Sequence, residues 1–183
     1  VTRIDDRAFY HCKSLTNFTL PQSLQILGYN VFLDTPYYDG SNNGLLYKDN
    51  WIVGYKGDMP NDSKITIKDG CVGVSYGIFM NAALSELNIP STFRYFGTFP
   101  FWNCECQLVN INCNIEENCD FSGNGFKEII FGNKVKYIKS DVGGLSLKKV
   151  TIGSNIEIIG KEAFSDSREL ESIKMSNSVK IIG

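Results

Sequence analysis

Apolar residues recur along the chain in one frame, leucine-x-x-Φ-x-Φ, in which Φ is any apolar residue. A second apolar cluster follows each frame, and then a small residue followed by phenylalanine. The middle apolar residue of the frame falls at Phe18, Ile65, Leu87, Ile111, Ile129, Val150 and Ile173. Successive steps are 47, 22, 24, 18, 21 and 23 residues, so the first step spans about two repeats. One disguised unit therefore lies between Phe32 and Ile65.

Each frame has the periodicity of a short β-strand. In residues 15–20, Phe18 and Leu20 alternate with Asn17 and Thr19, which places the two pairs on opposite faces. Pro21 follows, and it ends the strand because it has no N–H to donate. A single unit encloses too little apolar area to fold alone, so we expect stacked coils whose strands pair in parallel and line a concave face.

The segment from about 33 to 64 interrupts the repeat with turn-forming residues. Two apolar runs lie within it, Leu45–Lys48 and Trp51–Tyr55, and Asp49-Asn50 separates them. This arrangement predicts a β-hairpin that turns at Asp49-Asn50. We expect the hairpin to replace part of one repeat and to project from, or cap, one flank of the solenoid.

The frame Cys-x-x-Leu-x-x-Φ-x-Leu-Pro, with Ile-Gly-x-x-Ala-Phe after it, resembles the BspA-like (Treponema pallidum-type) leucine-rich repeats. Residues 1–32, 65–101 and 147–183 match best, whereas 102–146 departs from the pattern. The resemblance implies a right-handed, horseshoe-like α/β leucine-rich-repeat solenoid, with a parallel sheet on the concave face and short turns, 3₁₀ or helical pieces on the convex face. It also implies an extracellular or surface-attached protein of a host-associated microbe, with a role in adhesion.

Residues 1–183 are expected to form a single domain, interrupted only by the hairpin. The chain begins and ends in the same half-repeat, so we expect a fragment of a longer array. The net charge is −2 with both signs interspersed, which does not resemble a nucleic-acid-binding surface. No apolar run approaches the length of a membrane span, so membrane insertion is not expected.

The sequence offers little catalytic chemistry. His11 is the only histidine, and its place in a turn beside Cys12 favours a solvent-facing role over that of a general base. No catalytic residue, metal site or cofactor is predicted.

The six cysteines are assigned from their positions in the repeat. Cys12, Cys71, Cys104 and Cys113 fall in interior positions, which favours buried free thiols over zinc ligands. Cys106 and Cys119 lie outside the frame, and a disulfide between them stays open if the protein is exported.

Polar residues that flank the inward apolar positions are the main candidates for binding, because repeat proteins commonly bind ligands on such a sheet. A purely solvated sheet face is the alternative. The predicted residues are Asn17, Thr19, Glu86, Asn88, Asn110, Asn112, Glu128, Ile130, Lys149, Thr151, Ser172 and Lys174.

Three hairpin aromatics, Tyr47, Trp51 and Tyr55, are secondary candidates. Exposed aromatic side chains can anchor a protein partner or stack on a sugar. Packing of the hairpin onto the solenoid is the favoured alternative, since an isolated hairpin is only marginally stable.

The sequence thus predicts an extracellular or cell-surface module that binds a protein, such as a host extracellular-matrix or cell-surface protein. A carbohydrate-binding accessory protein that uses the hairpin aromatics is the second hypothesis. The oligomeric state is not indicated by any of these patterns.

Overall fold

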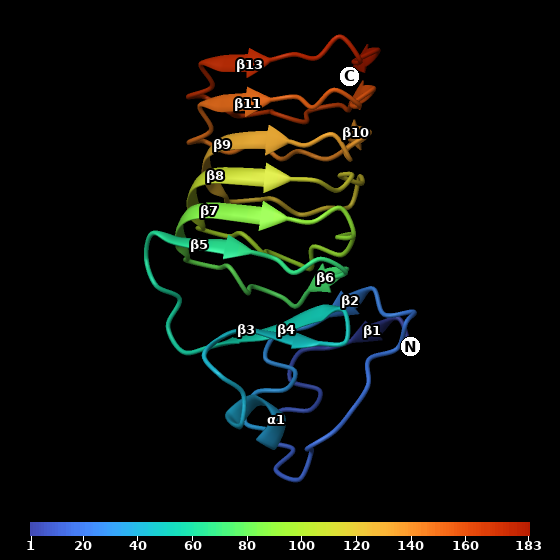
Figure 1. The fold of residues 1–183 in the computed structure, drawn as a ribbon, viewed down its shortest axis with the longest axis vertical. Coiled ribbons are helices and arrows are strands. Elements are labelled where there is room, and N and C mark those ends of the chain that lie inside the picture. The colour runs from blue at the N-terminus through green and yellow to red at the C-terminus, as the bar shows by residue number, and fades with distance from the viewer.

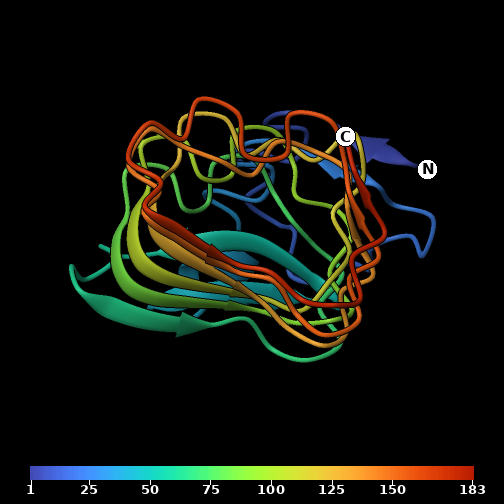
Figure 2. The ribbon, with the colours of Figure 1, turned by 90° about the horizontal axis from the view of Figure 1, so that it is seen from above.

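The computed structural model describes all 183 residues, and it is a solenoid of parallel strands stacked along one axis (Figure 1). Seen along that axis, successive coils overlie one another around a common centre (Figure 2). The main sheet has six parallel strands in the order β13-β11-β9-β8-β7-β5. Their bounds are β5 Ser63–Thr66, β7 Ala83–Ile89, β8 Glu105–Ile111, β9 Gly125–Phe131, β11 Lys149–Thr151 and β13 Ser172–Lys174.

Smaller sheets form further sides of the coils. Two of them are wholly parallel, and the third contains the hairpin β3-β4. Their strands are β1 Arg3–Ile4, β2 Ile26–Leu27, β3 Gly44–Lys48, β4 Trp51–Lys56, β6 Gly73–Val74, β10 Tyr137–Ile138, β12 Ile158–Ile159 and β14 Ile181–Ile182. The only helix is α1, Pro36–Asp39, and its four residues fall far short of the length and apolarity that crossing a membrane requires.

The expected solenoid and its parallel sheet are present, but the horseshoe is not. The six strands of the main sheet stack as a nearly straight column in Figure 1. Horseshoe curvature arises when helices make one side of each coil bulkier than the strand side. Here the other sides of the coils are turns and two-residue strands, so both sides of the stack have similar spacing.

The register of the main sheet corrects one repeat assignment. Val109, and not Ile111, lies in register with Leu87 on one side and Ile129 on the other. Cys106 therefore occupies the position of the leading leucine, in register with Leu84. With this correction the spacing no longer drifts, because the steps from Ile65 to Ile173 become 22, 22, 20, 21 and 23 residues.

The hairpin turns at Asp49-Asn50 as predicted, but it neither projects from the solenoid nor caps a flank. Strand β4 pairs in parallel with β6, so that Trp51 is opposite Gly73 and Ile52 opposite Val74. Because neighbouring side chains of a strand point to opposite faces, Trp51 and Val53 pack with the N-terminal coils while Ile52 joins the main core. The hairpin thus replaces one coil of the stack and joins two clusters of buried residues.

Gly73 makes this junction possible. A Cβ atom at this position would lie 2.6 Å from the Trp51 ring, which stacks on Tyr95 with the ring centroids 5.5 Å apart. The small residue lets the indole lie directly against the backbone of β6. We therefore infer that Gly73 determines how closely the hairpin packs against the next coil.

Phenylalanines that follow the second apolar cluster of the repeats form a spine of stacked rings inside the solenoid. Phe79 and Phe101 are buried, and their ring centroids lie 5.8 Å apart. Phe32 is also buried, whereas Phe9, which stacks on it, is 40% exposed. Phe9 belongs to the first coil, and only its next coil covers it. Its expected burial is therefore incomplete.

Candidate functional site

The outward-facing side chains of the main sheet form two rows that cross all six strands. We call these twelve residues the outer sheet face. The first row reads Lys64, Glu86, Leu108, Glu128, Lys149 and Ser172, and the second reads Thr66, Asn88, Asn110, Ile130, Thr151 and Lys174. Nine of the twelve residues predicted for the concave face lie in these rows.

The outer sheet face is ordered by a ladder of side-chain hydrogen bonds. Asn110 Nδ2 donates to Asn88 Oδ1 at 2.9 Å, and Asn88 Nδ2 donates to Glu86 Oε1 at 3.0 Å. Lys64 Nζ lies 2.8 Å from Glu86 Oε2. The Lys64 ammonium, followed by the amide of Asn88, lowers the pKa of Glu86 below its usual value. These bonds hold the polar groups in fixed directions on the sheet.

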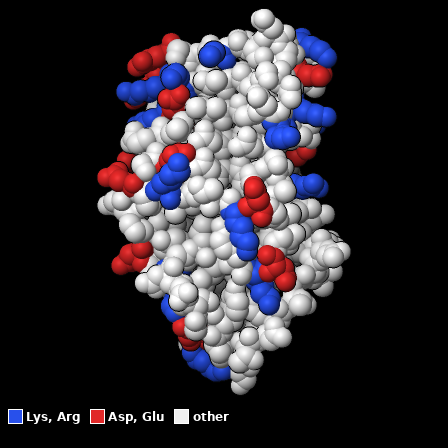
Figure 3. Space-filling model, in the orientation of Figure 1, with Lys and Arg blue, Asp and Glu red and all other residues white.

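A second ion pair lies on the outer sheet face, between strands β9 and β11. Lys149 Nζ lies 2.9 Å from Glu128 Oε1 on the neighbouring strand. Between the two ion pairs lie Leu108 and Ile130, which are half-buried although they point outward. The face thus combines a small apolar centre with charged groups of both signs at its sides. Oppositely charged groups also lie next to one another elsewhere on the surface (Figure 3).

Three predicted residues do not lie on this face. Asn17 and Thr19 are exposed but belong to no strand, because the hairpin occupies the layer between residues 15–20 and the main sheet. Leu20 N–H instead donates to Asp49 Oδ2 in the hairpin turn, at 2.7 Å. Asn112 follows the end of β8, a consequence of the corrected register. Leu108 was missed for the same reason.

The hairpin aromatics pack inward, so they form no exposed platform. Trp51 is only 2% exposed and unavailable to a ligand. Tyr47 is half-buried, and its hydroxyl accepts a hydrogen bond from Lys68 N. Tyr55 is also half-buried, and its carbonyl accepts a hydrogen bond from the Tyr38 hydroxyl at 2.8 Å. The packing alternative is the one the structure supports.

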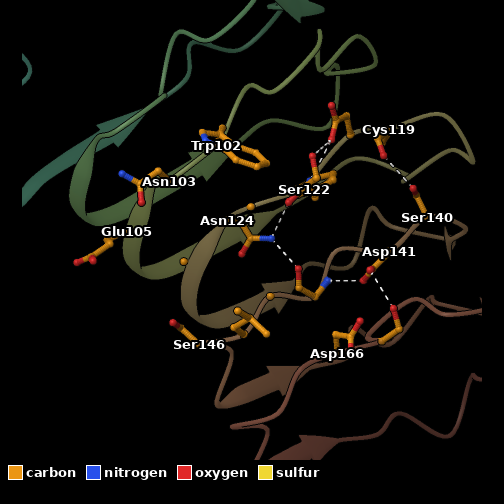
Figure 4. Close-up of a pocket in the computed structure, with 18 residues that line it drawn as sticks. Trp102, Asn103, Glu105, Cys119, Ser122, Asn124, Ser140, Asp141, Ser146 and Asp166 are labelled. Carbon is orange, nitrogen blue, oxygen red and sulfur yellow. Dashed lines mark hydrogen bonds between the residues drawn. The ribbon is translucent and has the colours of Figure 1, made fainter.

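A groove of about 640 Å³ opens beside the main sheet, at the coils between residues 102 and 166 (Figure 4). We call it the acidic groove. Its lining carries four carboxylates but no lysine, arginine or histidine. The four are Glu105, Asp120, Asp141 and Asp166. Glycines at 123, 125, 143 and 144 line the groove, where they bring no side chain to fill it.

Part of the polar lining holds the groove in shape. The Asn124 amide is buried and donates to Phe121 O at 2.8 Å and to Gly143 O at 2.7 Å, which ties two coils together. Asp141 accepts a hydrogen bond from Ser165 Oγ at 3.0 Å. Glu105 has no side-chain hydrogen bond or ion pair, and Asp166 makes only a long ion pair of 3.8 Å with the exposed Arg168.

The cysteines follow the prediction with one exception. Cys71, Cys104, Cys106, Cys113 and Cys119 are buried, and all six thiols are free, so Cys106 and Cys119 form no disulfide. Cys12 is exposed, contrary to expectation. It occupies the same position as the buried Cys104, but its coil is the first of the stack and is covered on one side only.

Burial makes the interior thiols unreactive. It raises the pKa of Cys104 and Cys113 to about 12, and that of Cys106 and Cys119 to about 11. Because the thiolate is the reactive species, we expect one thiol per native chain to react with a thiol reagent at pH 7.5, and six after unfolding in guanidinium. Cys12→Ser should abolish the native reaction. A second rapidly reacting native thiol would contradict the assigned burial, and a count of four after unfolding would reveal a disulfide.

No constellation suited to catalysis emerges. His11 lies in an exposed turn with its Nε2 3.3 Å from Asp34 Oδ2, and the structure brings no cysteine, serine or further base into an arrangement with it. No group of three or more histidine, cysteine, aspartate or glutamate side chains is placed to hold a metal ion.

Comparison with known families agrees with this geometry. The sequence matches the family described as BspA type Leucine rich repeat region in six copies, over residues 1–38, 58–142 and 142–183. The chain belongs to the BspA-type leucine-rich repeat family. Searches of curated proteins and of solved structures give no match.

The family match and the structure agree on where the BspA-type repeats are interrupted. The segment between 38 and 58, which no repeat copy covers, contains the hairpin β3-β4. The repeats do continue through 102–142, where the sequence alone indicated a departure from the pattern. Leucine-rich repeats of this kind are scaffolds for protein interaction.

Proposed function

We propose that this protein is an adhesive module on the surface of a microbial cell, and that it binds a host extracellular-matrix or cell-surface protein through the outer sheet face. The observation that carries the proposal is the apolar centre of Leu108 and Ile130, set between the ion pairs Lys64–Glu86 and Glu128–Lys149. Protein interfaces concentrate affinity in a small apolar centre surrounded by polar groups that exclude water.

The ordered ladder favours binding further. Asn88, Asn110 and their neighbours are fixed before a partner arrives, so little side-chain entropy is lost on association. The ion pairs expose both signs of charge, which selects a partner with a complementary pattern rather than a uniformly charged polymer. This chemistry fits a folded protein surface.

The test is binding of purified vertebrate extracellular-matrix proteins to the immobilised chain. We expect at least one of them to bind, and the double substitution Leu108→Ser with Ile130→Ser to weaken that binding by about tenfold or more. Ile26→Ser is the control, because it replaces an exposed apolar residue on β2. Strand β2 does not belong to the main sheet, so this residue lies outside the outer sheet face. Far-ultraviolet circular dichroism checks that each variant is folded.

Two results would count against the proposal. Equal binding by the double variant and the unsubstituted chain would remove the outer sheet face from the interface. Absence of binding to every matrix protein at micromolar concentration would remove the proposed partner class. For the location, an antibody against the chain should stain intact producing cells, and staining that requires lysis would refute it.

A further inference from the structure

Four aromatic side chains, three of them exposed and one half-buried, form a line that approaches the acidic groove. We call Tyr29, Tyr76, Phe99 and Trp102 the aromatic row. Consecutive rings meet edge to face, with centroids 5.7, 6.1 and 5.5 Å apart. Tyr29, Phe99 and Trp102 are 41%, 37% and 48% exposed. Scattered exposed aromatics are ordinary, but a continuous line of them marks a surface that meets another molecule.

The aromatic row is continuous with the acidic groove. Trp102 lines the groove, and Phe99 N–H donates to Asp120 Oδ2 at 3.0 Å. The indole of Trp102 lies against Gly123, where a Cβ atom would come within 2.5 Å of the ring. Gly123 also has a φ of +68°, a conformation that other residues rarely adopt. The backbone at Gly123 thus determines where the indole lies at the entrance of the groove.

We propose that the aromatic row and the acidic groove together bind an extended peptide that carries lysine or arginine side chains. The site is separate from the outer sheet face, and the inference goes beyond the function proposed above. The four carboxylates and the absence of any cation in the lining give the groove a charge that only a cationic ligand complements. This contrasts with the rest of the chain, in which 18 basic and 16 acidic residues are nearly balanced.

Two carboxylates that accept no side-chain hydrogen bond are placed to meet such a ligand. Glu105 is exposed at the start of β8 and has no ion-pair partner. Asp166 lies on the opposite side of the groove (Figure 4), and its nearest cation, Arg168, is 3.8 Å away on an equally exposed side chain. Trp102, the member of the aromatic row that lines the groove, offers a ring face to a cation or to an apolar side chain.

The dimensions favour an extended chain. From Tyr29 to Asp166 the site crosses about seven layers of the stack, or about 30 Å at a spacing of about 4.8 Å per layer. An extended peptide covers that length with about nine residues. A single side chain or a compact ligand would occupy only a small part of the site.

The probe is a fluorescein-labelled decapeptide of alternating lysine and proline, which is extended, cationic and able to pack on aromatic rings. Binding is measured by fluorescence polarisation. We expect the lysine peptide to bind, a matched glutamine–proline peptide to bind at least about tenfold more weakly, and binding to weaken as salt increases. Equal binding of the two peptides would overturn the proposal.

Three variants locate the site. Glu105→Gln with Asp166→Asn removes two carboxylates that make no structural hydrogen bond, and should weaken binding about tenfold. Trp102→Ala should also weaken it, and Gly123→Ala should do so by displacing the indole without removing it. The control, Glu171→Gln with Asp69→Asn, makes the same change in net charge at exposed positions outside the groove.

The remaining outcomes are decisive in either direction. An equal loss in the control would show that net charge alone attracts the peptide, which overturns the proposal. Displacement of the peptide by maltohexaose would assign the site to a neutral glycan instead. The variant Leu108→Ser with Ile130→Ser should bind the peptide normally, so that failure of this proposal and failure of the outer sheet face are distinguished.

Discussion

Raising the pH from 8 to 9.5 is expected to reduce the free energy of unfolding by about 5 kcal/mol through four buried thiols. The pKa of Cys104 and Cys113 is raised to about 12, and that of Cys106 and Cys119 to about 11. In the unfolded chain each thiol ionises with a pKa near 8.5. Above that value the unfolded state binds fewer protons than the folded state, so stability falls as pH rises.

The size of the effect follows from the difference in bound protons. Each thiol contributes about 1.3 kcal/mol over this interval, because the folded state stays protonated while the unfolded state ionises. The stabilisation is complete below about pH 8.5, and it is lost progressively up to the folded pKa values of about 11 to 12. Because small domains are stable by only about 5–15 kcal/mol, the chain should be close to unfolding at pH 10.

The measurement is urea denaturation at half-unit intervals from pH 7 to 9.5, below the ordinary pKa of tyrosine. A matched variant, Cys104→Ala, removes one of the four thiols and should reduce the slope of stability against pH by about a quarter, whatever it does to stability at pH 7. An unchanged slope in that variant, or a stability that is level up to pH 9.5, would show that the thiols are hydrated in the folded protein.

The solenoid could be predicted from sequence because the strand centres have few alternatives. Around Leu87, Ile129 and Val150, a single alternating pattern fits the frame, and a shift by one residue would turn every apolar side chain to solvent. The outward residues Glu86, Glu128 and Lys149 followed from that register, and the structure places them on the outer sheet face.

The register of β8 could not be predicted in this way. Leu108 fits the leading position of the frame and Ile111 its centre, yet the frame in the structure begins two residues earlier, at Cys106, and is centred on Val109. A shift by two residues preserves the alternation of faces, so the pattern of apolar positions does not distinguish the two registers. The deciding feature is that Cys106, a small apolar thiol, fills the position of the first leucine.

The acidic groove and the aromatic row were missed because they depend on how turns stack between coils. Phe99 and Trp102 follow the same turn pattern as the buried spine, and only their neighbours determine that they are exposed. A sequence signal did exist, since Gly123, Gly125, Gly143 and Gly144 cluster in two neighbouring coils and carry no side chains to fill the surface. A run of glycines at equivalent positions of adjacent coils indicates a hollow in the surface.

The aromatic spine supplies the second large effect that we expect. Phe101→Ala should reduce the free energy of unfolding by about 3–5 kcal/mol, because the ring is 1% exposed and its removal leaves a cavity that the surrounding coils cannot fill. The centroid of the Phe101 ring lies 5.3 Å from the ring centroids of both Phe121 and Phe126. It also stacks on Phe79, so a single truncation loosens the packing of several consecutive coils.

The matched control is Phe99→Ala, which deletes the same side chain two residues earlier, where it is 37% exposed. We expect Phe99→Ala to reduce the free energy of unfolding by less than half as much as Phe101→Ala does. The Phe99 ring is partly hydrated in the folded protein, and its removal leaves no closed cavity. Urea denaturation followed by circular dichroism measures both variants. Similar losses for the two would mean that Phe101 is no better packed than a surface residue. Because Phe121 both contacts Phe101 and lines the acidic groove, Phe101→Ala should also weaken binding of the lysine–proline peptide.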